Sequence, residues 1–162
     1  MRKSKSFVSA IVGVTLALGS PAAANPAWSG DARSAEQLRE LDIMLMVTSL
    51  RCRRSSNDFT ADYDDFAHNH RQTMNAAAGQ LRDTYASGRS RRAQNRTIDT
   101  LSTTMANRYG LGHPWLDCAE LRSVVRTLAD ERDVGVLVTA AEELLADRPR
   151  QGVGQLSLYQ AD

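Results

Sequence analysis

Apolar residues spaced three and four apart constrain the fold of this chain more than any other feature. The clearest run consists of Phe59, Tyr63, Phe66, His70, Met74, Ala77, Leu81 and Tyr85. An α-helix turns by about 100° per residue, so this spacing gathers all eight residues on one helical face. Acidic residues at positions 58, 62, 64 and 65 crowd the first turns, where the helix dipole favours negative charge. We therefore predict one amphipathic helix over about 58–85, capped by Asn57 or Asp58 and weakened at Gly79.

The same spacing and local end signals predict the other helices. Ser34 opens an S-x-x-Q capping box, and Pro114 fits the first position of a helix whose N-cap is His113. Pro149 ends the last helix. The predicted ranges are 34–50, 91–109, 114–129 and 133–147. Short connections between such segments predict an all-α, up-and-down bundle of four to five helices.

The N-terminus has the three-part layout of a secretory signal peptide. Basic residues come first, an apolar run of 12 residues extends from Phe7 to Leu18, and small residues at 22–24 favour cleavage after Ala24. The run is too short to span a bilayer, which takes about 20 residues. We therefore expect a periplasmic or secreted protein with no transmembrane anchor after cleavage. The predicted organisation is a signal peptide over 1–24, a lead-in over 25–33, a helical bundle over 34–148 and a flexible tail over 149–162.

Two cysteines, Cys52 and Cys118, remain in the exported chain. An even count in an oxidising compartment favours a disulfide, and the simplest antiparallel topology puts both residues at the same end of the bundle. Neither belongs to a C-x-x-C pair, so the spacing does not indicate a zinc site or a haem attachment. We predict a disulfide between them. Two free buried thiols are the alternative.

Arginine carries all the positive charge of the exported chain. Removing Arg2, Lys3 and Lys5 from the 20 basic residues leaves 17 arginines against 19 acidic residues, a formal charge of −2. Such a domain has no overall field that would gather nucleic acid or an anionic membrane. A local cluster of Arg89, Arg91, Arg92 and Arg96 could still bind an anionic polymer or an acidic partner. The alternative is a connection whose arginines are only solvated. No aromatic residues lie between these arginines, which argues against a site for single-stranded nucleic acid, where bases stack on aromatic side chains.

The segment DYDDFAHNH contains two of the three histidines. His70 falls on the apolar face, which predicts a core histidine satisfied by a hydrogen bond or, alternatively, a pH-sensing residue. His68 points to the opposite face, four residues after Asp64. These two could supply half of a metal site, with His113 as a distant third ligand, but zinc takes three or four ligands. The alternative is an ordinary acid–imidazole pair on a wet helix face. We expect no bound cofactor.

Catalytic signatures are absent from the sequence. There is no G-x-S-x-G nucleophile motif, and neither G-x-x-x-x-G-K nor G-x-G-x-x-G occurs. A catalytic carboxylate pair cannot be selected among 19 acidic residues from sequence alone. These observations favour a protein that is not an enzyme.

The segments LDIMLMVTSLRCR (41–53) and NRYGLGHPWLDCAEL (107–121) resemble a family of small, exported, helical proteins from Gram-negative bacteria whose function is not established. The resemblance covers about 35–145. Some members of such families are labelled S-adenosyl-L-homocysteine hydrolase. That enzyme is much larger and binds NAD in a Rossmann domain, whereas this chain has neither the glycine fingerprint nor the strand–helix alternation of that domain. The resemblance implies no catalytic residues.

The sequence thus predicts a non-enzymatic periplasmic helical module that binds or buffers another envelope protein. A carrier of a small ligand or metal, with His70 or His113 at its site, is one alternative. A small hydrolase with an unrecognised carboxylate site is the other.

Overall fold

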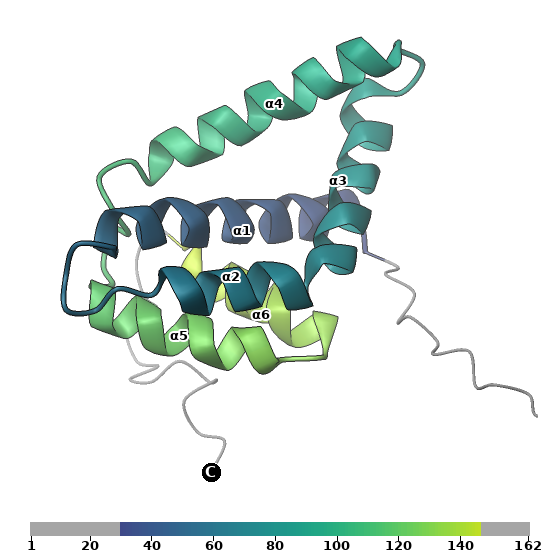
Figure 1. The fold of residues 1–162 in the computed structure, drawn as a ribbon. Helices are drawn as coiled ribbons and strands as arrows, with labels where there is room; N and C mark the ends of the chain where they lie inside the picture. Colours follow the sequence, from purple (N-terminus) through teal and green to yellow (C-terminus); the bar gives the residue numbers. More distant parts are fainter. Residues whose placement is uncertain (1–29, 147–162) are drawn as a thin grey trace, which may run out of the picture.

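The computed structural model describes residues 30–146, and the predicted signal peptide and C-terminal tail therefore lie outside the described residues (Figure 1). The all-α class is confirmed, because residues 30–146 form helices and connections without a strand. The helices are α1 (Ala32–Cys52), α2 (Thr60–Asn69), α3 (Arg71–Ala86), α4 (Arg91–Arg108), α5 (Cys118–Asp130) and α6 (Val134–Leu144). No helix in this part of the chain is both long and apolar enough to cross a membrane.

α1 lies at the centre of the fold and contacts each of the other five helices. Figure 1 shows α4 on one side of α1, with α2, α5 and α6 on the other. Ten residues of α1 are buried, namely Ala35, Leu38, Glu40, Leu41, Ile43, Met44, Leu45, Thr48, Ser49 and Cys52. These residues point in several directions around the helix, so α1 is the element on which the others pack. Phe59 and Phe66 are fully buried and bring α2 into the same core.

The helix predicted over 58–85 is in fact two helices that meet at His70. The φ and ψ angles of His70, −99° and 9°, leave the helical region, and the chain changes direction there. Figure 1 shows α2 beside α5, whereas α3 runs across the bundle toward α4. The prediction of one continuous helix was therefore wrong. Gly79, by contrast, does not interrupt α3.

The break at His70 is held by contacts with the end of α5. The Asn69 side-chain amide donates to the carbonyl oxygen of Ala129 over 3.0 Å, and His70 Nε2 lies 2.7 Å from the carbonyl oxygen of Leu128. These carbonyls belong to the last turn of α5, where the helix supplies few N–H groups to pair with them, and the Leu128 carbonyl also accepts from the Glu131 backbone N–H over 3.2 Å. The junction between α2 and α3 therefore satisfies the C-terminal end of another helix.

Two predicted helix starts were also wrong. Asp31 caps α1, because its carboxylate accepts from the Ser34 backbone N–H over 2.8 Å, and the helix begins at Ala32 inside the expected lead-in. Asp117 caps α5 in a capping box with Glu120, four residues beyond His113. In a capping box, the N-cap carboxylate accepts from a backbone N–H in the first turn, and the glutamate three residues later accepts from the backbone N–H of the N-cap residue. Pro114 consequently lies in the non-helical connection between α4 and α5.

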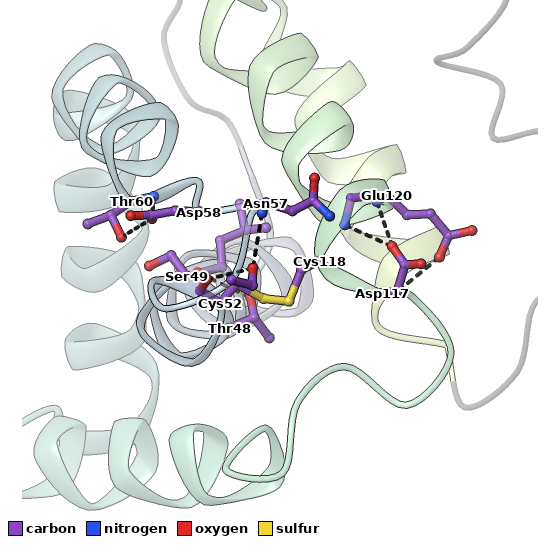
Figure 2. Close-up of a disulfide and its surroundings, with 12 residues drawn as sticks. Thr48, Ser49, Cys52, Asn57, Asp58, Thr60, Asp117, Cys118 and Glu120 are labelled. Atoms are coloured by element: carbon purple, nitrogen blue, oxygen red, sulfur yellow. Dashed lines mark hydrogen bonds between the residues drawn. A yellow bond between two sulfur atoms is a disulfide. The ribbon is translucent and has the colours of Figure 1, made fainter.

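The disulfide between Cys52 and Cys118 is confirmed (Figure 2). It joins the last residue of α1 to the first residue of α5, with 5.8 Å between the two Cα atoms. Beside it, the Asp58 carboxylate accepts from the backbone N–H and the hydroxyl of Thr60 at the start of α2, over 2.9 and 2.7 Å. The ends of three helices are therefore gathered at this end of the bundle.

Residues 87–90 make the turn that joins α3 to α4, and the two helices run in clearly different directions from it (Figure 1). Gly88 has a φ of +72°, a conformation that L side chains rarely adopt. α4 packs mainly against α1 and α3, and among its 18 residues only Ile98 and Met105 are buried. Figure 1 shows α4 diverging from α1 toward the turn. The C-terminal end of α4, which we call its base, is thus held on the bundle, and the first half of the helix is more peripheral.

Candidate functional sites

The four predicted anion-binding arginines lie together at the turn between α3 and α4, and we call them the arginine tip: Arg89, Arg91, Arg92 and Arg96. All four residues are exposed. None of them forms an ion pair with another residue in 30–146, whereas Arg39, Arg108, Arg122 and Arg126 each pair with a carboxylate. The positive charge of the tip is therefore left uncompensated by the rest of the described chain.

The position of these arginines on α4 is electrostatically unfavourable for an isolated helix. Ser90 caps α4 by accepting from the Ala93 N–H, and Arg91 and Arg92 follow in the first turn, which contains no acidic residue. The helix dipole favours negative charge at an N-terminus, so two cations there are disfavoured by a few tenths of a kcal/mol each, up to about 1 kcal/mol. An anionic group bound at the tip would relieve this repulsion.

His70 lies in the core, where the apolar spacing put it, and only 5% of its surface is exposed. Its ring packs on Phe66 with 4.7 Å between the ring centroids, and Nε2 is bonded to the Leu128 carbonyl. Burial lowers the pKa of His70, while the hydrogen bond to Leu128 acts in the opposite direction. The residue therefore has the structural role of a core histidine. Its pH-sensing role stays a prediction.

The structure does not bring the weak metal candidates together as a ligand group. Asp64 and His68 are exposed on α2. His113 lies in the connection between α4 and α5, and both of its ring nitrogens already contact backbone groups. Within residues 30–146, no group of three or more His, Cys, Asp or Glu side chains could hold a metal ion.

Three carboxylates of α1 bind tyrosines from three other helical segments, an arrangement that sequence reasoning missed. Glu36 accepts from Tyr85 at the end of α3, over 2.8 Å. The Tyr63 hydroxyl of α2 donates to Asp42 over 3.1 Å, and the Tyr109 hydroxyl at the end of α4 donates to Glu40 over 3.0 Å. These are the three tyrosines of the described chain, so each one ties a peripheral helix to α1.

Two of these tyrosine bonds are enclosed and reinforced by arginine. Arg108 donates to Glu40 and Arg39 pairs with Asp42. Burial raises the pKa of Tyr63 and of Tyr109, and the neighbouring carboxylates raise both further. Burial also raises the pKa of Asp42, although Arg39 opposes this effect. A tyrosine whose pKa is raised is a poor general base at neutral pH, so these groups act as ties between helices. The only signal for them in the sequence is a set of acids on an otherwise apolar helix.

The sequence analysis also missed an exposed leucine at the base of α4. Leu111 is 93% exposed in a turn closed by a bond from the Gly112 N–H to the Tyr109 carbonyl. Arg51 Nη1 donates to the Gly110 carbonyl over 2.7 Å and holds this turn against the end of α1. The turn therefore presents Leu111 from a fixed position, close to the disulfide end of the bundle.

No protein-family model, curated protein or solved structure matches this chain.

Proposed function

We propose that this protein is a non-enzymatic interaction module of the bacterial cell envelope that binds an acidic partner protein through the arginine tip. The observation that carries the proposal is the set of four exposed arginines without an ion pair among residues 30–146. Arg51, Arg53 and Arg54 are also exposed near the end of α1, but Arg51 is engaged by the Gly110 carbonyl. The tip gathers four arginines at one turn of a chain whose predicted exported form has a formal charge of −2.

The chemistry of the tip favours carboxylates. The guanidinium group is planar and always charged, and it offers parallel donors that fit both oxygens of a carboxylate. Between positions 80 and 100 there are five arginines and two aspartates, a local formal charge of +3. The local charge is opposite in sign to that of the exported chain as a whole, so an acidic partner would be steered toward the tip and away from the rest of the surface.

The base of α4 supports this role because it is anchored. Arg108 and Tyr109 both bond to Glu40 of α1, and Arg39 donates to the Ser102 hydroxyl over 3.2 and 3.3 Å. A partner bound at the tip would therefore meet a helix whose second half is fixed to the central helix. Such pre-organisation reduces the entropy lost on binding.

The interior polar groups also favour an interaction role over catalysis. The two buried or half-buried histidines bond to backbone carbonyls, and the enclosed carboxylates Glu40 and Asp42 accept from tyrosines and arginines. Each of these groups is engaged in holding helices together. The disulfide is consistent with the oxidising compartment that the predicted signal peptide implies.

The test is a charge reversal with a matched control. Arg91→Glu/Arg92→Glu replaces two positive charges of the tip by negative ones, and Arg53→Glu/Arg54→Glu makes the same change in net charge at two exposed positions after α1. Glutamate is favoured in the first turn of a helix, so the tip variant should fold as well as the native protein. Each protein would be crosslinked in intact envelopes, and its partner identified by mass spectrometry and then purified.

We expect the tip variant to lose the partner and the control variant to keep it. With the purified partner, the dissociation constant of the tip variant should rise at least tenfold, and the native affinity should weaken as salt is raised. Equal binding by all three proteins would contradict the proposal. Equal loss in both variants would also contradict it, because the effect would then belong to net charge and not to the tip.

A further inference from the structure

Two histidines of this fold hold the C-terminal ends of helices, but they do so in different ways. His70 Nε2 contacts the Leu128 carbonyl of α5, and His113 Nε2 lies 2.9 Å from the carbonyl oxygen of Leu144, the last residue of α6. His70 engages only this one nitrogen in a hydrogen bond with the described residues. His113 engages both, and this difference decides what protonation would do.

The hydrogen bonds of His113 define its protonation state. Its Nδ1 accepts from the backbone N–H of Leu116 over 3.0 Å and, more weakly, from that of Trp115 over 3.4 Å. An accepting nitrogen carries no proton, so the single proton of the neutral ring is on Nε2 and is donated to Leu144. A second proton on Nδ1 would replace the acceptor with a donor that faces two other donors.

The groups that His113 orders form a clamp on the end of α6. The Trp115 ring packs edge-on against His113 with 4.7 Å between the centroids, and its indole Nε1 donates to the Ala146 carbonyl over 3.1 Å. Two carbonyls at the end of α6 are therefore held by side chains of the connection between α4 and α5. The chain continues from this point into residues 147–162.

We propose that His113 is an acid-sensitive latch, whose neutral ring holds the end of α6 on the α4–α5 connection and whose protonation at Nδ1 releases Trp115 and the end of α6. The proposal is independent of the arginine tip. It moves the pH-sensing role from His70 to His113, because only His113 would lose an acceptor on protonation.

The surroundings of His113 set the direction of its response. Burial lowers the pKa of His113, whereas the bond to Leu144 and the charge of Glu120 on α5 act in the opposite direction. Arg51 of α1 lies against the preceding turn, and the last turn of α6 carries Glu142 and Glu143, of which Glu142 accepts from Gln37 of α1. Since burial is the largest effect, the latch stays closed at neutral pH and opens below the ordinary histidine pKa of about 6.5.

The experiment follows the fluorescence of Trp115 as the pH falls from 7.5 to 5. The chain contains two tryptophans, so all proteins would carry Trp28→Phe. His113→Asn retains an acceptor oxygen near the position of Nδ1 but cannot titrate, and His70→Asn is the matched control. We expect a red shift of the Trp115 emission in the parent and in His70→Asn, and none in His113→Asn. Far-ultraviolet circular dichroism would show that helicity persists at the pH of the shift.

Several results would overturn the latch. One is a red shift that persists in His113→Asn, and another is a shift that disappears in His70→Asn. A loss of helicity with the same midpoint would also do so, because release would then be global unfolding. If His113→Asn fails to fold, ¹H–¹⁵N correlation spectra of the histidine rings in the native protein provide the decisive measurement. We expect neutral His113 protonated on Nε2 at pH 7.5, and a proton on Nδ1 at that pH would refute the geometry on which the latch rests.

Discussion

The disulfide between Cys52 and Cys118 should contribute a large share of the stability of this domain. It closes a loop with a sequence separation of 66 residues. In the chain-entropy model, a cross-link of this span restricts the unfolded chain by about 4 kcal/mol at 25 °C. Domains of this size have free energies of unfolding of about 5–15 kcal/mol, so the loss of the cross-link would remove a substantial fraction. We therefore expect reduction to leave a folded but markedly less stable protein.

The assay is equilibrium unfolding in urea, followed by circular dichroism, with the oxidised and the fully reduced protein compared. The free energy of unfolding should fall by about 4 kcal/mol on reduction. The dependence on urea should become steeper, because the reduced unfolded chain exposes more surface. Cys52→Ala/Cys118→Ala is the control for packing, since Cys52 is only 3% exposed and its truncation leaves a small cavity. The double variant should therefore be slightly less stable than the reduced native protein.

A loss of less than about 1 kcal/mol on reduction would refute this reasoning, because the chain-entropy model requires a larger effect for a loop of this length. An unchanged urea dependence together with a large loss would refute it in another way. The stabilisation would then come from contacts in the folded protein and not from restriction of the unfolded chain.

Three further predictions concern a tyrosine that ties two helices, the cap of α5, and the contrast between an exposed and a buried leucine. Tyr109→Phe removes the hydroxyl that binds Glu40 and should lower the free energy of unfolding by about 1.5–3 kcal/mol in urea titrations, as expected for a hydrogen bond to a charged group. The pKa of Tyr109 is raised, so the folded protein keeps the phenol proton that the unfolded chain releases. The free energy of unfolding should consequently fall as the pH rises above about 10. Tyr109→Phe should make this fall with pH less steep, and an equally steep fall in the variant would contradict the bond between Tyr109 and Glu40. Asp117→Ala should cost about 1 kcal/mol by removing the cap of α5, and no change in the melting temperature would exclude the capping box as a source of stability. Leu111→Ser should change the free energy of unfolding by less than about 0.5 kcal/mol because Leu111 is exposed. Leu128→Ala should lower it by about 2–5 kcal/mol because Leu128 is fully buried, and thermal unfolding of both variants would measure the difference.

The apolar spacing of the sequence was sufficient to predict the fold class and the main core residues. Helix α4 begins and ends within one residue of the predicted range, because its capping serine and the turn before it are local signals. The disulfide could also be predicted, since the predicted signal peptide implied an oxidising compartment and an antiparallel topology put both cysteines at the same end. The predicted signal peptide and tail lie outside the described residues and stay predictions.

The break at His70 could not be predicted from local sequence. No glycine or proline lies near it, and the apolar spacing of Phe66, His70 and Met74 stays in phase across it. The reason for the break lies in α5, whose terminal carbonyls are bound by Asn69 and His70. The start of α5 was mistaken for a related reason. Pro114 fits a helix start, but the His113 side chain before it does not cap a helix. Its ring nitrogens contact the Leu116 backbone N–H in the connection and the Leu144 carbonyl of α6.

The sequence by itself thus determined which residues are apolar and which stretches are helical, because these follow from periodicity and composition along each segment. Only the tertiary structure decided what the polar residues do. Tyr109 meets Glu40, His113 donates to Leu144 and Arg126 pairs with Asp62, and in each case the partner lies tens of positions away along the chain. Hydrogen bonds and ion pairs act over a few ångströms with defined directions, so their partners are fixed by the packing of helices and not by spacing along the chain.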